Sequence, residues 1–440
     1  MSKFIGIRHE DKYVMERRAP LTPRHVERLI KGKKLDIVVQ TSRKRVFTDQ
    51  EYIDAGATIA DNLDNCSVIL GVKEMPNSFF QPEKTYVFFS HVIKGQAYNM
   101  PMLRKMMELG CNLIDYEKIV DEQGKRLIFF GRYAGLAGMI NSLWSLGLRL
   151  KEYGYDTPFL KIKQAHKYAS LSEAKEVISI VGQEIAEKGM PEELRPFTVG
   201  FTGYGNVAQG AQEILGLLPV KEISPDKLLS LKKRKLLPNN LIYKVIFKEE
   251  HLSAHNEGLE FDLPDYYAHP ENYHGIFEKY IPHLSILMNC MYWDTRYPRI
   301  ITKDYLEKVY KSGRPKLTVI GDVTCDPDGS IEITHKGTEI EDPIFVYHPD
   351  TRSYTMGHKG EGMLVMAVDI LPSELPRDSS AGFADALINF VKSIADCDFN
   401  EPFADLDLPR AIKKALILHN GELTPDYVYL KAHVEKLSVI

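Results

Sequence analysis

The sequence has little of what marks secreted, membrane-embedded or nucleic-acid-binding proteins. Its five cysteines lie far apart and include no CxxC pair, unlike the dense framework of a disulfide-stapled domain. No stretch approaches about 18 consecutive apolar residues, and the N-terminal segment has no long apolar core. The formal charge is only -4, which gives no broad attraction to nucleic acid or to anionic membranes. We therefore expect a cytoplasmic protein with reduced thiols, no nucleic-acid or membrane partner, and small-molecule ligands.

The sequence has no set of residues with the spacing of a calcium loop or a zinc site. The segment 326–329 resembles the start of a calcium loop, but its glycine comes too early and Gly337 occupies the twelfth position, where a glutamate is required. His269 and His274 have no second ligand pair at zinc spacing. The sequence therefore predicts no metal site.

The composition is that of a folded protein with an α/β architecture. The chain has 440 residues, of which 44% are hydrophobic and 26% charged, so two or three domains with large cores are expected. Short apolar runs alternate with helical segments, which is typical of parallel sheets. The runs expected to be strands are residues 4–7, 36–39, 67–72, 85–89, 113–114, 196–201, 242–247, 285–288, 317–320 and 363–368.

Helical segments and composition shifts predict the domain boundaries. The apolar segment 134–150 predicts a buried helix linking two domains, and its small early residues would allow close packing against a neighbour. We expect the first domain to comprise residues 1–131 plus 377–440. The second should comprise residues 132–376, with an insertion around 224–284 that is rich in Lys, Pro, Tyr and His.

A glycine-rich turn follows the run 196–201. Residues 202–210 read TGYGNVAQG, so a G-x-G-x-x-A pattern lies between a strand and a helix, the context that a dinucleotide-binding turn requires. Gly203 allows the tight turn, Gly205 lets a pyrophosphate approach the backbone, and Ala208 permits helix–strand packing. An ordinary tight turn is the alternative.

The residues after this turn leave the cofactor open. Glu222, nineteen residues after Gly203, falls where a ribose-binding carboxylate is expected, although its side chain could equally face solvent. The basic run 232–235 could meet a 2′-phosphate or be a solvated face. These residues alone do not decide between NAD and NADP.

Several motifs in order resemble one enzyme family, the lysine-forming saccharopine dehydrogenases, which are grouped with alanine dehydrogenase and the transhydrogenase nucleotide-binding subunit. The resemblance is strongest to the lysine-ketoglutarate reductase half of bifunctional aminoadipic semialdehyde synthases, and it covers nearly the whole chain. The motifs are MERRAPLTP (15–23), ILGVKEMP (69–76), FFSHVIKGQ (88–96), LIDYEKIVDEQGKR (113–126), FGRYAGLAGM (130–139), TGYGNVAQGAQ (202–212), NCMYWDTRYPR (289–299), GDVTCDPDGSIE (321–332) and AVDILPSELPRD (367–378).

The resemblance implies two Rossmann-like domains with parallel sheets, separated by an active-site cleft. It implies reductive condensation of L-lysine with 2-oxoglutarate to saccharopine, with NADP as cofactor and NAD as the alternative, and a separate glutamate-forming saccharopine dehydrogenase as a partner enzyme. Two alternatives stay open: another amino-acid or opine dehydrogenase of the alanine dehydrogenase superfamily, and a non-catalytic NAD(P)H-binding protein.

The resemblance also assigns the site residues. Lys73 and His91 would be the catalytic acid–base pair, since a lysine among cations can have a lowered pKa and histidine titrates near neutrality. A surface ion pair between Lys73 and Glu74, and a structural role for His91, are the alternatives. The expected substrate-binding residues are Glu16, Arg18, Lys94, Glu117 and Arg126, although Glu16 and Arg18 could simply pair with one another. The expected cofactor-binding residues are Gly203, Gly205, Asn206, Val207, Glu222, Cys290, Met291, Asp322 and Asp369.

Overall fold

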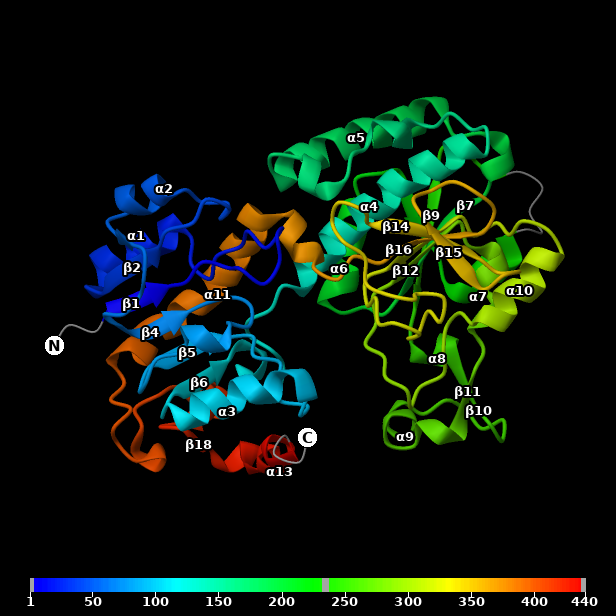
Figure 1. Cartoon of the computed structure of the whole chain (residues 1–440). Helices are drawn as coiled ribbons and strands as arrows, with labels where there is room; N and C mark the ends of the chain where they lie inside the picture. The colour runs from blue at the N-terminus through cyan, green and yellow to red at the C-terminus, as the bar shows by residue number, and fades with distance from the viewer. Residues whose placement is uncertain (1–3, 232–236, 437–440) are drawn as a thin grey trace. The chain divides into compact units, whose positions relative to one another are not determined.

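The computed structural model describes residues 4–231 and 237–436, so the basic run 232–235 lies outside the described residues. The chain divides into two compact units (Figure 1). Unit 1 is Met1–Phe130 with Pro376–Ile440, and unit 2 is Gly131–Leu375. The described part of each unit contains one eight-stranded, largely parallel sheet with helices, which confirms the predicted α/β fold class. The cleft expected between two domains stays a prediction.

The sheet of unit 1 has the strand order β18-β17-β6-β5-β4-β1-β2-β3. β1 lies between β2 and β4, so the strand order runs outward from it in both directions along the sheet. Open α/β sheets bind ligands at such a switch point. Parallel pairing places the carboxyl ends of β1, β4, β5 and β6 on one edge. The strands are β1 (Phe4–Ile7), β2 (Asp36–Gln40), β3 (Thr58–Ala60), β4 (Cys66–Leu70), β5 (Thr85–Phe88), β6 (Asn112–Asp115), β17 (Leu416–His419) and β18 (Glu422–Leu423).

The helices of unit 1 come from both ends of the chain. They are α1 (Pro23–Lys33), α2 (Asp49–Asp54), α3 (Met100–Glu108), α11 (Pro376–Asp396), α12 (Arg410–Ala415) and α13 (Lys431–Glu435). Along α11, Phe383, Leu387, Val391 and Ile394 recur at helical spacing and are buried, so this face joins the core formed by residues 5–130. Helix α11 packs on α1, and α13 packs on α3.

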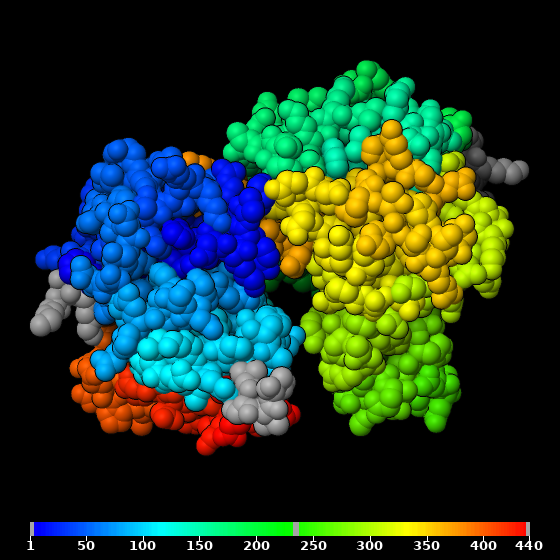
Figure 2. Space-filling model, in the orientation of Figure 1, coloured from blue at the N-terminus to red at the C-terminus, as the bar shows by residue number. Residues whose placement is uncertain are grey.

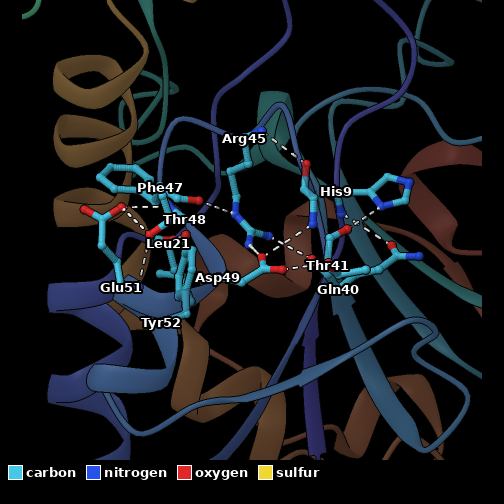
Figure 3. A network of polar contacts seen from close by, with 11 residues as sticks. His9, Leu21, Gln40, Thr41, Arg45, Phe47, Thr48, Asp49, Glu51 and Tyr52 are labelled. Atoms are coloured by element: carbon cyan, nitrogen blue, oxygen red, sulfur yellow. Dashed lines mark hydrogen bonds and ion pairs between the residues drawn. The ribbon is translucent and has the colours of Figure 1, made fainter.

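A buried arginine holds the loop that follows β2 (Figure 3). Arg45 Nη1 donates to the Gln40 carbonyl (2.8 Å), and its Nη2 donates to Asp49 Oδ1 (2.5 Å). The Thr41 hydroxyl donates to the other oxygen of Asp49, and the Thr41 carbonyl lies 3.1 Å from His9 Nδ1. The guanidinium therefore ties the end of β2 to the start of α2, and Thr41 ties that loop to the one after β1.

The sheet of unit 2 has the strand order β15-β14-β16-β13-β12-β7-β9-β8 (Figure 1). Only the pairs that include β14 are antiparallel. β7 lies between β9 and β12, so this sheet also has a switch point, at the end of the strand that precedes the glycine-rich turn. The strands are β7 (Phe197–Thr202), β8 (Val220–Glu222), β9 (Ile242–Phe247), β12 (Ile286–Asn289), β13 (Val319–Asp322), β14 (Ile344–His348), β15 (Ser353–Met356) and β16 (Met363–Met366).

Two helices of unit 2 pack closely against each other, with glycines at their contact. The small residues at the start of α4 allow the close packing that the sequence predicted, and the neighbour is α6, the helix after the glycine-rich turn. A Cβ on Gly135 of α4 would lie 1.8 Å from the Val207 carbonyl oxygen, and one on Gly210 of α6 would lie 2.0 Å from the Arg132 carbonyl oxygen. The helices of this unit are α4 (Gly131–Glu152), α5 (Leu171–Lys188), α6 (Asn206–Leu215), α7 (Pro225–Ser230), α8 (Glu249–Leu252), α9 (Leu263–Ala268) and α10 (Lys303–Lys311).

The predicted insertion at 224–284 is too wide. β9 lies inside that range, yet it is a full strand of the sheet and the direct neighbour of β7. The segment 248–283 does lie outside the sheet, and it carries α8, α9 and the antiparallel pair of β10 (Ser253–His255) with β11 (Tyr273–Gly275). Figure 2 shows this segment, in green, gathered at one end of unit 2.

Two further findings concern the chain's general character. Among residues 4–231 and 237–436, no helix is both long enough and apolar enough to cross a bilayer. The five cysteines are buried, and none of them forms a disulfide bond.

Candidate active site

The predicted acid–base pair lies at the carboxyl edge of the unit 1 sheet. Lys73 follows β4 and His91 follows β5, and these two strands are parallel neighbours. His91 Nδ1 donates a hydrogen bond to Glu74 Oε1 (2.6 Å). The backbone of His91 has a φ of +49°, in the left-handed region that a non-glycine residue seldom adopts, and such strain is concentrated at functional sites.

Glu74 is a site residue that sequence reasoning missed, because it was considered only as an ion-pair partner of Lys73. Its side chain is buried, and Lys12 Nζ lies 2.7 Å from its second oxygen. Burial would raise the pKa of Glu74, but the hydrogen bond from His91 and the contact with Lys12 lower it to about 2. An ionised Glu74 keeps the proton of His91 on Nδ1, because a ring nitrogen's hydrogen bond fixes the tautomer.

Glu16 and Arg18 form the mutual pair that the sequence left as an alternative. Arg18 Nε donates to Glu16 Oε1 (2.8 Å) and Nη2 to Oε2 (2.5 Å), and both side chains are buried. The guanidinium also lies 4.2 Å from the ring centroid of Phe130. Burial would raise the pKa of Glu16, but Arg18 and then Lys73 lower it below its usual value. Glu16, Arg18 and Lys73 therefore belong to one charge cluster.

The other predicted substrate-binding residues lie apart from this cluster. Arg126 forms an ion pair with Glu117, just beyond β6, and the arginine is 51% exposed. Lys94 is exposed on the loop after β5. The structure thus brings Lys73, Glu16 and Arg18 together, whereas Glu117 and Arg126 form a second, more open pair.

A second carboxylate that sequence reasoning missed sits at the switch point. Glu10 is buried, its Oε1 accepts from Val72 N (2.7 Å), and its Oε2 accepts from Lys73 N (2.9 Å). Burial, and then the nearby Glu16, raise the pKa of Glu10 to about 7. Glu10 therefore holds the peptide that carries Lys73. Its place in the loop that follows the apolar strand β1 was the available signal.

Replacing Glu10 tests this burial. The folded-state pKa of about 7 is above the ordinary 4.5, so the stabilising contribution of Glu10 is fully present below pH 4.5 and is lost as pH rises through 7. At about 1.4 kcal/mol per pKa unit, the loss is about 3 kcal/mol. Because Glu10→Gln cannot titrate, the difference in unfolding free energy between wild type and variant should change by that amount between pH 5 and 8.

Denaturant titrations at several pH values measure this difference. Glu27→Gln, at a half-exposed position on α1, serves as control. Parallel pH profiles for wild type and Glu10→Gln would contradict the expectation.

In unit 2, the glycine-rich turn fits a pyrophosphate. Gly203 has a φ of +86°, and a Cβ there would lie 3.0 Å from the Cys290 carbonyl oxygen, so only glycine fits. The Cβ position of Gly205, the N-cap of α6, faces open space, and no side chain caps the helix. Asn206 and Val207 form the first helical turn, whose N–H groups are thus free for an anionic group.

A cavity of about 260 Å³ adjoins this turn. Cys290 and Met291, which follow β12, line it together with Gly203 and Gly205, so four of the predicted cofactor-binding residues share one site. Its other walls are five tyrosines and one acidic side chain, Glu249. Of these residues, the sequence had indicated only Tyr292, which follows Met291.

Glu222, the predicted ribose-binding carboxylate, lies one strand further from the glycine-rich turn than the sequence suggested, and its role stays a prediction. It lies on β8, which β9 separates from β7, and its carboxylate lies 2.7 Å from Lys244 Nζ. The prediction assumed that the next strand in the sequence is the next strand in the sheet. β9 has six residues, as many as β7, whereas β8 has three.

The two predicted aspartates have different environments. Asp322 is buried and accepts hydrogen bonds from Asn289 Nδ2 (2.8 Å), Thr334 Oγ1 (2.6 Å) and Cys325 N (3.1 Å). Burial raises its pKa to about 6. These bonds give Asp322 the role of joining the ends of β12 and β13. Asp369 is exposed after β16, beside Gly337.

Comparison with known proteins identifies the family. Residues 6–137 match the model of the alanine dehydrogenase/PNT N-terminal domain, and residues 276–426 match that of the C-terminal domain. The chain belongs to the alanine dehydrogenase/PNT family. In accordance with this, an L-alanine dehydrogenase structure superposes over 98% of this chain and 99% of its own, with a TM-score of 0.60 and 16% identity. The transhydrogenase from Sinorhizobium meliloti gives a TM-score of 0.56 over 96% of this chain and all of its own.

Within the alanine dehydrogenase/PNT family, curated relatives bear out the resemblance of the motifs. The alpha-aminoadipic semialdehyde synthase of Arabidopsis thaliana is 42% identical over 97% of this chain, and the mitochondrial one of Bos taurus is 35% identical over 99%. The chain spans 41% and 49% of those two proteins. A saccharopine dehydrogenase [NAD(+), L-lysine-forming] of Yarrowia lipolytica is 24% identical over 87% of this chain and 90% of its own length.

Proposed function

We propose that this chain is an oxidoreductase that joins L-lysine and 2-oxoglutarate reductively into saccharopine, in a reversible reaction. The observation that carries the proposal is that Lys73 and His91, the latter hydrogen-bonded to Glu74, follow two neighbouring strands at the carboxyl edge of the unit 1 sheet. Unit 1 would be the substrate domain and unit 2, with its glycine-rich turn, the dinucleotide-binding domain. Saccharopine would be consumed by a separate glutamate-forming dehydrogenase.

The reaction needs several proton transfers. The lysine ε-amine adds to the ketone, the carbinolamine loses water to give an imine, and a bound nicotinamide supplies the hydride. Groups that exchange protons near neutral pH speed such steps. His91, whose Nδ1 is engaged by Glu74, has Nε2 for this exchange. Lys73, held through its peptide by Glu10, is the second acid–base group.

The substrates bring carboxylates that need cations. Arginine binds carboxylates in a bidentate manner, and Arg126 is exposed enough to exchange Glu117 for a substrate carboxylate. Lys94 is exposed at the same sheet edge as a second cation. Arg18 is already paired with Glu16 in the buried cluster, and the two would receive substrate as a unit. Glu16 and Glu117 would then accept the lysine amine.

The cofactor is a nicotinamide adenine dinucleotide. Gly203, Gly205, Asn206 and Val207 would hold its pyrophosphate, with Cys290 and Met291 alongside and Asp369 at the nicotinamide end. The motifs favoured NADP with NAD as the alternative, and the names of the fungal relatives specify NAD(+). The residues around the adenosine ribose decide between them, as argued below.

An assay of nucleotide oxidation tests the function. NADH and NADPH oxidation are followed by absorbance with L-lysine plus 2-oxoglutarate and, in parallel, with pyruvate plus ammonia. We expect oxidation only when L-lysine and 2-oxoglutarate are both present. Turnover with pyruvate and ammonia instead would make the chain a different amino-acid dehydrogenase. Nucleotide binding without turnover on either pair would make it a non-catalytic binding protein.

A further inference from the structure

Glu249 lies where dinucleotide-binding folds bind the adenosine ribose. It begins α8, one residue after the end of β9, and Lys248 lies between them. The residues of β9 pair in register with β7 up to Thr202 and Phe247. Gly203 N donates to the Phe247 carbonyl (3.2 Å), so the end of β9 is hydrogen-bonded to the glycine-rich turn. In dinucleotide-binding folds, an acidic residue at the end of the strand beside the first one binds the ribose hydroxyl, whereas a cation there accommodates a 2′-phosphate.

Two tyrosines from different segments hold the Glu249 carboxylate in place. Tyr267, on α9, donates to Glu249 Oε1 (2.8 Å). Tyr204, inside the glycine-rich turn, lies 3.3 Å from Oε1 and 3.2 Å from Oε2. Burial, and then Glu249, raise the pKa of both phenols, so both stay protonated donors at neutral pH. A carboxylate held from two sides cannot easily swing away from an incoming group.

The charge of the cavity has one sign. Among the described residues that line it, Glu249 carries the only charge and none is basic. A 2′-phosphate brings a charge of about -1.5 to -2. Close to Glu249 it would meet repulsion, and none of the described residues that line the cavity supplies a compensating cation. Like charges of this kind are a common basis of discrimination. A ribose 2′-hydroxyl would instead donate a hydrogen bond to the carboxylate.

We propose that Glu249, held by Tyr204 and Tyr267, makes this site selective for NAD(H) over NADP(H). The carboxylate accepts the ribose hydroxyls and excludes a 2′-phosphate. Tyr266 and Tyr297, which also line the cavity with their rings 5.1 Å apart, offer an aromatic wall for the adenine. The inference rests on the proposed function only in requiring that the glycine-rich turn bind a dinucleotide.

Titration calorimetry with NADH and with NADPH tests this without turnover. For the wild type we expect NADH to bind at least about tenfold more tightly, which corresponds to about 1.4 kcal/mol. Glu249→Gln should weaken NADH about tenfold and strengthen NADPH, so that the preference is lost or reversed. Tyr267→Phe should lower the preference in part, because the carboxylate loses one of its two donors. Glu250→Gln removes the same charge from the next residue, which does not line the cavity, and should leave the ratio unchanged.

The possible failures are distinguishable. NADPH binding as tightly as NADH to the wild type, or equal effects of Glu249→Gln and Glu250→Gln, would overturn the selectivity while leaving the proposed function standing. A wild-type protein that binds neither nucleotide would overturn the proposed function and the selectivity with it. Thermal unfolding curves of each variant show whether a lost affinity reflects a lost fold.

Discussion

His91→Gln and Lys73→Met are each expected to slow the proposed formation of saccharopine by about 10²- to 10⁴-fold, the usual contribution of a positioned acid or base. His91→Gln removes the imidazole that Glu74 orients at 2.6 Å. Lys73→Met removes the ammonium that contributes to the lowered pKa of Glu16. Both effects should fall on kcat, measured with saturating substrates by nucleotide oxidation.

Matched substitutions separate chemistry from general damage. Lys31→Met and His274→Gln make the same replacements at exposed positions, and they should retain nearly full activity. NADH binding by the two site variants should stay close to that of the wild type, because the nucleotide residues belong to unit 2. A loss below about threefold in both site variants would remove Lys73 and His91 from the reaction.

The strands were predictable because buried parallel strands are continuous apolar runs. β1 was predicted at its exact bounds and β5 to within one residue, since charged residues or turns flank each run. The order of strands in a sheet was not predictable from local pattern. β8 precedes β9 along the chain but lies outside it in the sheet, and nothing local to residues 220–222 indicates this. Glu222 was expected beside the glycine-rich turn, and the structure places it one strand further away.

For the site, too, local sequence pattern predicted some residues and not others. Lys73 and His91 were predicted as site residues because they follow apolar runs inside recognisable motifs, and the structure places both at one edge of the unit 1 sheet. Glu74 gains its meaning from a histidine 17 residues away, and Glu10 from amide groups more than 60 residues away. Such partnerships depend on which strand ends meet at an edge, and sequence spacing does not contain that information.

Gly135→Ala is expected to destabilise unit 2 and to weaken nucleotide binding. Its new Cβ would lie 1.8 Å from the Val207 carbonyl oxygen and 2.7 Å from Ala211 N, both of which are backbone atoms of α6. A backbone cannot give way as a flexible side chain does, so α4 and α6 must separate. Such overpacking lowers the free energy of unfolding by up to about 3 kcal/mol.

The same displacement would reach the nucleotide site, because Val207 is in the first turn of α6, beside Gly205. We expect the free energy of unfolding to fall by about 3 kcal/mol in denaturant titration and NADH affinity to fall at least about tenfold in calorimetry. The control is Gly32→Ala in α1, where a Cβ meets nothing within 4 Å and helix propensity favours alanine by up to about 1 kcal/mol. If Gly135→Ala were as stable as Gly32→Ala, the close α4–α6 crossing could not be what holds the phosphate-binding turn in place.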